Sequence, residues 1–297
     1  MKFTIDKIIV LSIVLFSSAG SLAKEQLSEW RTLDLNNTVL LTLPHGKVVI
    51  ELAPQFSPNH VAQYSTLVKE GFYDGEQFYR VIDGFVAQAG PQDESDKDKS
   101  VPILAIEETW NTKNDWPFAK VQTNDLFAFE TGFKDGFAIA RDKPSNKSDD
   151  KVKTWLTHCP GTLAMARGNE PDTASSHFYF VIGQAPRYLD KIMTIFGRVV
   201  YGMNHIQAIQ RTSVIEGEKA IDKSNFTSMV SMKLMSDVPV KDLILIEVEN
   251  TSTPEFADKI VNRRLRENAF FYKKPPPVLD VCQVPIKSRV IPIPLNK

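Results

Sequence analysis

Two polar side chains, Arg80 and Gln88, lie among apolar β-forming residues in the segment Phe78 to Gly90, FYRVIDGFVAQAG. Arginine stays charged at all relevant pH values and donates hydrogen bonds from a planar fork, so it can stabilise a transition state without a nucleophile, a metal or a titrating base. Asp83-Gly84 between the apolar runs indicates a chain reversal close to Arg80. On this segment alone, an arginine that points to solvent from a sheet edge is the more ordinary interpretation.

A second segment, Gly161 to Ile182, favours a functional role for Arg80 instead. It reads GTLAMARGNEPDTASSHFYFVI and predicts two apolar strands around a polar loop. Together with FYRVIDGFVAQAG and with YLDKIMTIFGRVVYGM (Tyr188 to Met203), it resembles the cyclophilin family of peptidyl-prolyl isomerases. The three blocks keep their order across roughly residues 38 to 250, and two long insertions interrupt them.

The resemblance implies a mainly β fold, a closed eight-stranded antiparallel barrel capped by helices. The cyclophilin-like domain is expected over residues 33–250, with insertions at about 106–158 and 212–239, followed by a C-terminal helix and a Pro-rich tail over 251–297. The first insertion is rich in aromatic residues, so we expect it to fold against the main domain. The apolar run Val240 to Val248 predicts a closing strand.

One helix start is clear from the residues themselves. Ser57-Pro58 supplies a typical N-cap and a proline at the first helical position, and apolar residues recur at helical spacing up to Gly71. The pattern predicts a helix over Pro58 to Glu70, with His60 exposed in its first turn.

The resemblance also implies the residues of the site. Arg80, Phe85 and Gln88 would be catalytic. The matching substrate-binding positions are Val86, Ala166, Arg167, His177, Tyr179, Tyr188, Leu189 and Met193. For the aromatic residues among them, ordinary packing in a β core is the alternative.

The chemistry implied is slow without a catalyst. A peptide bond before proline isomerises over a barrier of about 18–20 kcal/mol. In the twisted transition state the amide loses its resonance and the prolyl nitrogen becomes more basic. A donor aimed at that nitrogen by Arg80 would stabilise the twisted state but not the planar ground state. The resemblance therefore implies a peptidyl-prolyl isomerase that acts on proline-containing peptides and unfolded exported proteins. The alternative is a cyclophilin-fold binding module or chaperone with weak or no isomerase activity.

Strand periodicity raises one geometric problem for this site. A two-residue turn at Asp83-Gly84 would place Arg80 and Gln88 on opposite faces of the sheet, because successive side chains alternate. A longer connection or a β-bulge is therefore needed to bring both to one groove. Tyr79 also departs from the family, in which a histidine usually precedes the arginine.

Composition and missing motifs exclude several other functions. The 297 residues are 42% apolar and 24% charged with a formal net charge of −1, which is ordinary for a soluble globular protein and gives no basis for nucleic-acid binding. The sequence contains no HExxH, CxxC, Walker loop or GxSxG motif. We expect neither a cofactor nor a metal.

The N-terminal residues 1–23 predict a secretory signal peptide. Lys2 and Lys7 precede a short apolar run that ends in small residues, and this run is too short for a stable membrane span. The mature protein is therefore expected in a bacterial periplasm. In an oxidising compartment Cys159 and Cys282 predict a disulfide, with two separate buried thiols as the alternative.

Overall fold

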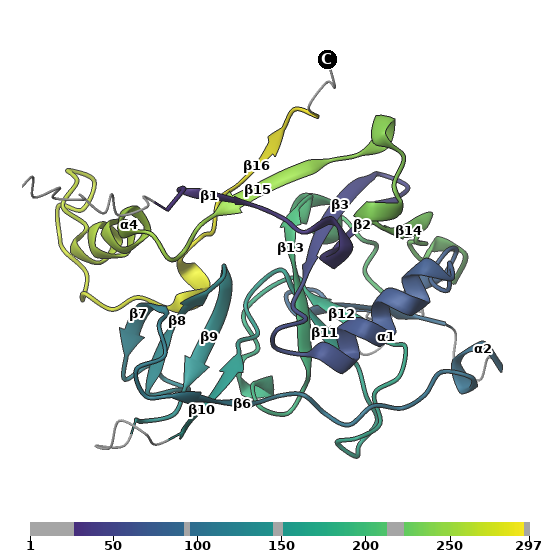
Figure 1. The fold of residues 1–297 in the computed structure, drawn as a ribbon, viewed down its shortest axis with the longest axis horizontal. Coiled ribbons are helices and arrows are strands. Elements are labelled where there is room, and N and C mark those ends of the chain that lie inside the picture. Colours follow the sequence, from purple (N-terminus) through teal and green to yellow (C-terminus); the bar gives the residue numbers. More distant parts are fainter. Residues whose placement is uncertain (1–26, 92–95, 145–150, 213–222, 294–297) are drawn as a thin grey trace, which may run out of the picture.

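The computed structural model describes residues 27–91, 96–144, 151–212 and 223–293 (Figure 1). Within them the chain forms antiparallel sheets of eight, five and three strands. The helices are α1 (Pro58–Lys69), α2 (Asp96–Lys99), α3 (Met203–Gln207), α4 (Pro254–Leu265) and the short 3-10 turns η1 (Leu35–Asn37), η2 (Arg187–Leu189), η3 (Lys223–Asn225), η4 (Met235–Asp237), η5 (Val240–Asp242) and η6 (Val281–Gln283). The expected signal peptide lies outside the described residues. Among those that are described, no helix has the length and apolar character that a membrane crossing requires.

The eight-stranded sheet contains the segments that resemble cyclophilins. In the order of neighbouring strands it consists of β14 (Ser231–Leu234), β2 (Thr38–Leu43), β3 (Gly46–Leu52), β13 (Ile195–Tyr201), β11 (Thr162–Met165), β12 (Phe178–Val181), β5 (Val86–Gly90) and β4 (Gln77–Val81). The helix α1 lies across one face of this sheet (Figure 1).

This sheet is an open half-barrel, so the expectation of a closed eight-stranded barrel was wrong. Its edge strands β14 and β4 do not pair along their length, and an isolated bridge joins Gln77 to Ser228. The remaining links are backbone hydrogen bonds between residues 75–78 and 227–229, such as the one from the Gly75 N–H to the Met229 carbonyl, 2.8 Å. Gly75 has φ +82°, so the chain is not extended at the residue that contacts Met229.

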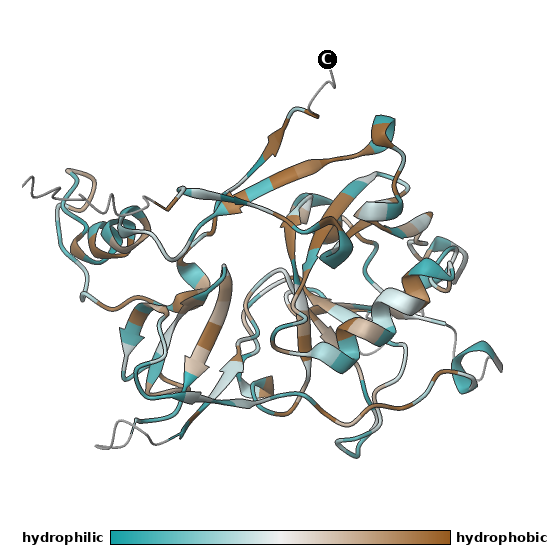
Figure 2. Ribbon diagram, in the orientation of Figure 1, coloured by the Kyte–Doolittle hydropathy of each residue, from teal (hydrophilic) through white to brown (hydrophobic). Residues whose placement is uncertain are grey.

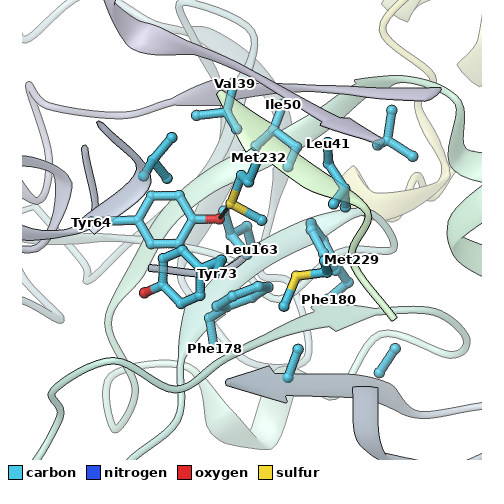
Figure 3. Packing of buried hydrophobic residues seen from close by; sticks show 14 of the residues in the cluster. Val39, Leu41, Ile50, Tyr64, Tyr73, Leu163, Phe178, Phe180, Met229 and Met232 are labelled. Carbon is cyan, nitrogen blue, oxygen red and sulfur yellow. Dashed lines mark hydrogen bonds between the residues drawn. The ribbon is translucent and has the colours of Figure 1, made fainter. Parts of the chain in front are cut away.

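The main core lies between α1 and the inner face of the eight-stranded sheet (Figure 3). Tyr64 of α1 packs against Phe178 and Phe196, with ring centroids 5.5 and 4.8 Å away. Its hydroxyl lies 3.0 Å from the Met232 sulfur, and Met229 belongs to the same buried cluster. Each such aromatic contact contributes about 0.5–1.5 kcal/mol beyond area burial. The methionines in the expected second insertion are therefore part of the core.

The helix α1 starts at Pro58 as predicted, but a distant residue caps it. The Ser57 hydroxyl donates to the Ile195 carbonyl at 2.6 Å and makes no capping hydrogen bond. Instead, the backbone N–H groups of Asn59 and His60 donate to the Glu107 carboxylate at 3.1 and 3.0 Å. The expectation that His60 is exposed was wrong. Its ring is fully buried, and Nδ1 lies 2.7 Å from Glu107, because the chain that enters the first insertion covers this turn.

The aromatic segment after residue 106 folds into the five-stranded sheet, against the main domain as expected. Its strands, in order of neighbours, are β6 (Trp110–Lys113), β10 (Lys151–Leu156), β9 (Phe137–Arg141), β8 (Glu130–Lys134) and β7 (Ala119–Thr123). Phe137, Ile139 and Leu156 share a buried cluster with the half-barrel residues Val86 and Tyr179. The inserted sheet therefore packs directly behind the expected substrate groove.

The three-stranded sheet joins the two ends of the described chain. It consists of β1 (Trp30–Thr32), β15 (Leu245–Glu249) and β16 (Ser288–Ile291), and β15 is largely hydrophobic (Figure 2). The expectation of a closing barrel strand over Val240 to Val248 was wrong. The 3-10 turn η5, which follows Pro239, occupies its first three residues, and the strand that comes after it pairs with β1 and β16 instead.

The C-terminal segment is attached to the rest of the molecule at three places. Thr253 caps α4 by accepting from the Phe256 N–H at 3.3 Å, and Phe256 packs into a cluster with Val121 and Phe133 of the inserted sheet. In the structure Cys282 forms a disulfide with Cys159. The tail then ends as β16, at the edge of the three-stranded sheet.

Candidate active site

A longer connection between β4 and β5 brings Arg80 and Gln88 to the same face of the sheet, since the pairs Arg80–Gln88 and Val81–Ala87 and the hydrogen bond from the Ile82 N–H to the Val86 carbonyl follow the turn without a break. The β4–β5 register runs from Phe78 opposite Ala89 directly to Arg80 opposite Gln88, so Tyr79 is the extra residue. The connection between the strands is also longer than two residues, since β4 ends at Val81 and β5 begins at Val86. Of the two solutions that periodicity allowed, the longer connection is therefore the one that pairs Arg80 with Gln88, and the bulge at Tyr79 lies on the other side of Arg80 from the turn.

Arg80 and Gln88 contact each other directly. An Nη1–H of Arg80 donates to the Gln88 Oε1 at 3.1 Å, and the Gln88 amide N–H donates to the Tyr79 hydroxyl at 2.6 Å. The Arg80 side chain is exposed. Among the described residues no further hydrogen bond involves its guanidinium, so the other N–H groups can reach a bound molecule.

Tyr79 extends this chain of hydrogen bonds to His177. The Tyr79 hydroxyl lies 2.7 Å from His177 Nδ1, and His177 Nε2 lies 3.5 Å from an Asp98 carboxylate oxygen. With Nε2–H facing the carboxylate, Nδ1 accepts from Tyr79, whose oxygen accepts from Gln88. Each group then has a matching donor or acceptor. His177, expected to line the groove, is thus linked to Arg80 through Tyr79 and Gln88.

The apolar floor of the site comes from the adjoining strands. Tyr179 is directly opposite Gln88 in the β12–β5 pair, so the two side chains lie on one face. Val86 and Tyr179 are buried, while Phe85, Ala166 and Met193 are partly buried against the same cluster. A floor of this kind can accept a small apolar ring beside the charged guanidinium.

Other expected site residues lie on the loop between β12 and β13. Tyr188 is 65% exposed and Leu189 is half-buried, and neither belongs to the buried cluster of the floor. The Arg167 guanidinium donates to the Ile192 carbonyl from Nε and Nη2, at 3.0 and 2.9 Å. The Arg167 side chain therefore holds the loop that carries Met193.

A buried polar chain behind the floor was missed by sequence reasoning. The Tyr179 hydroxyl lies 2.9 Å from His158 Nε2, and His158 Nδ1 lies 2.9 Å from Asp190. Asp190 in turn accepts from Arg187 Nε at 2.6 Å. Burial raises the pKa of Tyr179 well above its ordinary value, so the hydroxyl stays protonated and donates to His158. No local pattern could have found this chain, because its members come from separate segments.

The described residues contain no cluster of three or more His, Cys, Asp or Glu side chains that could hold a metal ion. What the site offers is an orientated guanidinium, a primary amide and an apolar floor. That set can bind a peptide and donate a hydrogen bond to it.

Comparisons with known proteins identify a family. The family model "Cyclophilin type peptidyl-prolyl cis-trans isomerase/CLD" matches residues 38–233. A "Probable peptidyl-prolyl cis-trans isomerase" of Brucella suis is 33% identical over 183 residues, which cover 62% of this chain and 76% of that protein. "Peptidyl-prolyl cis-trans isomerase B" of Bacillus subtilis is 27% identical over 171 residues, which cover 58% of this chain and 88% of that protein.

A solved structure is similar to this chain over a longer stretch. The crystal structure of cyclophilin AquaCyp293 from Hirschia baltica has a TM-score of 0.68 and 27% identity, and the match covers 88% of this chain and 93% of that one. It therefore reaches beyond the residues of the family model. These matches confirm the expected enzyme class. The chain belongs to the cyclophilin-type peptidyl-prolyl cis-trans isomerase family.

Proposed function

We propose that this protein isomerises peptidyl-prolyl bonds in exported polypeptides, and that Arg80 donates a hydrogen bond to the prolyl nitrogen in the twisted transition state. The observation that carries the proposal is the pairing of Arg80 with Gln88, 3.1 Å apart, on the face that also presents Tyr179. A fixed positive donor at the edge of an apolar floor is the arrangement that this reaction needs.

The preference for the transition state follows from the electronic structure of the amide. In the planar peptide the nitrogen lone pair is delocalised into the carbonyl and accepts hydrogen bonds poorly. As the bond twists, the lone pair becomes localised on nitrogen, and the attraction to Arg80 grows. Because Gln88 already holds one N–H of the guanidinium, the fork is orientated before the peptide binds.

The size of the effect requires more than one interaction. An acceleration of about four decades corresponds to roughly 5.5 kcal/mol of differential stabilisation. A hydrogen bond to a charged group contributes about 1.5–3 kcal/mol. The remainder is assigned to orientation and desolvation of the proline ring on the floor of Phe85, Val86 and Tyr179.

We also propose that residues 1–23 direct export and are removed. The disulfide between Cys159 and Cys282 supports this proposal, because such bonds persist in oxidising compartments such as the bacterial periplasm. Mass spectrometry of protein from its natural host should find an N-terminus at Lys24 or a few residues away. Soluble protein that retains Met1 and the apolar run would contradict it.

The activity is tested with the mature chain and a set of short proline-containing peptides. We expect exchange between cis and trans isomers, followed by NMR, to accelerate in proportion to protein concentration. If no peptide is accelerated while the protein still binds unfolded chains, the binding-module or chaperone function replaces the isomerase.

A further inference from the structure

The connection between β7 and β8, residues 124–129, presents two consecutive large apolar side chains to solvent. Leu126 is 88% exposed and Phe127 is 45% exposed. Single exposed apolar residues are common on protein surfaces and need no explanation. Two neighbours at the end of a hairpin do need one when the hairpin is rigid and lies next to a binding site. We call residues 124–129 the β7–β8 tip.

The β7–β8 tip is rigid because its own hydrogen bonds close it. The Asn124 N–H donates to the Phe129 carbonyl at 2.7 Å, and Asn124 adopts a left-handed conformation with φ +57°. The Asp125 carboxylate accepts from the Phe127 N–H at 3.1 Å, which is an Asx turn. The Phe129 N–H donates to the Arg141 carbonyl of β9 at 3.1 Å. Leu126 and Phe127 are therefore held outward by an ordered backbone.

The β7–β8 tip contacts the loop that carries part of the expected proline pocket. The Asp125 carboxylate lies 3.3 Å from Arg187 Nη2, and the Arg187 guanidinium carbon lies 5.2 Å from the centre of the Phe127 ring. Arg187 is buried and also binds Asp190. The residue that follows it in the chain is Tyr188, which is 65% exposed. Phe127 thus contacts Arg187, and the next residue in the chain, Tyr188, is an exposed aromatic residue expected to line the groove.

The charge at this junction indicates the class of ligand. Arg187 pairs with the carboxylates of both Asp125 and Asp190, and Asp190 also accepts a hydrogen bond from His158, so both carboxylates are engaged within the protein. What the tip offers to a ligand is then Leu126 and Phe127. An apolar side chain would be favoured there over a charged one, because burial of apolar surface supplies the gain.

We propose that the β7–β8 tip is a second peptide-binding subsite, which takes an apolar side chain of the same extended polypeptide whose proline occupies the pocket. This inference rests on the proposed isomerase function. An unfolded chain is the fitting occupant, since it presents apolar side chains within a few residues of its prolines. Arg187 contacts Phe127 and directly precedes Tyr188, one of the expected groove residues, so we expect one extended segment to reach both.

The test compares proline peptides that carry Leu, Phe or Ser at successive positions on either side of the proline. Wild-type mature protein should show a kcat/KM about tenfold higher for the best apolar peptide than for its Ser counterpart. In the double variant Leu126→Ser, Phe127→Ser this ratio should fall towards one. The matched control is Phe270→Ser, Tyr272→Ser, which changes two aromatic residues exposed to 83 and 87% on the C-terminal segment and should keep the wild-type ratio.

Three results overturn the inference. The first is an unchanged ratio in the Leu126, Phe127 variant. The second is an equal loss in the control variant. The third is a dimer of the wild type, seen by sedimentation, that the variant lacks, because a second copy of the chain would then cover the tip. If the wild type isomerises no peptide, the proposed function fails instead, and fluorescence titration with the same peptides still shows whether the tip contributes to binding.

Discussion

Replacing Tyr79 by Phe tests whether the hydrogen-bond chain behind Arg80 positions it for catalysis. The Tyr79 hydroxyl accepts from the Gln88 amide at 2.6 Å and lies 2.7 Å from His177 Nδ1. Phe keeps the ring, which packs edge-on against His177 with centroids 5.5 Å apart, and removes only the oxygen. Gln88 then loses the partner that orientates the amide, and Arg80 loses a fixed acceptor.

The magnitude follows from the two hydrogen bonds that are lost. Each contributes a net of about 0.5–1.5 kcal/mol, so the two together contribute about 1–3 kcal/mol to the order of the chain from His177 through Tyr79 to Gln88. If roughly half of this energy is lost from the stabilisation of the transition state, kcat falls about three- to tenfold, because 1.4 kcal/mol corresponds to one decade in rate. Because Arg80 acts on the twisted amide and not on the bound ground state, we expect the loss in kcat and little change in KM.

The assay is peptide isomerisation by wild type, Tyr79→Phe and the control Tyr272→Phe, which removes a hydroxyl from an exposed ring on the C-terminal segment. Circular dichroism and urea unfolding check that each variant is folded. Full activity of Tyr79→Phe would refute a positioning role for Tyr79. A loss confined to KM would show that the hydroxyl supports peptide binding and not the orientation of Arg80.

Three further predictions concern stability. The Cys159–Cys282 disulfide joins residues 123 positions apart, so Cys282→Ser should lower the free energy of unfolding by about 2–4 kcal/mol, seen as a lower Tm; an unchanged Tm would contradict this. Burial lowers the pKa of His60 below its ordinary 6.5, so the unfolded chain takes up a proton first and stability should decrease as the pH falls below about 6.5. Urea unfolding at about pH 7.5 and about pH 5.5 measures the loss, which should be smaller in His60→Asn; equal losses in both proteins would argue against it. His158→Ala leaves the buried Tyr179 hydroxyl without its partner and should cost about 2–4 kcal/mol in the same experiment, whereas a cost below about 0.5 kcal/mol would show that the buried chain is unimportant for stability.

Features that depend on neighbouring residues could be predicted from the sequence. The start of α1 at Pro58 needs only Ser57-Pro58 and the apolar spacing that follows. The need for a bulge or a longer connection between Arg80 and Gln88 also follows from strand alternation. The position of the bulge at Tyr79 does not, because it depends on how β5 pairs with β4 and β12 together.

Features that depend on distant segments could not be predicted. The capping of α1 by Glu107, 47 residues after His60, buries a histidine that the local pattern would expose. The pairing of β15 also depends on distant segments, since this strand forms a sheet with β1 and β16 and does not join the half-barrel. The chain from Tyr179 through His158 to Asp190 forms only when three segments meet, and buried polar groups take whatever partners the fold brings to them.

The most direct test of the proposed mechanism is the isomerisation rate of Arg80→Ala, compared with Arg80→Lys and with the control Arg289→Ala. Arg289 is an exposed arginine that pairs with Glu247 in the three-stranded sheet, away from the half-barrel. We expect Arg80→Ala to stay folded by circular dichroism and to lose at least about tenfold in kcat/KM, which is 1.4 kcal/mol or more of transition-state stabilisation. Arg80→Lys should recover little, because lysine keeps the charge but not the planar fork, and Arg289→Ala should match the wild type. A folded Arg80→Ala with full activity would show that Arg80 is not the catalytic group.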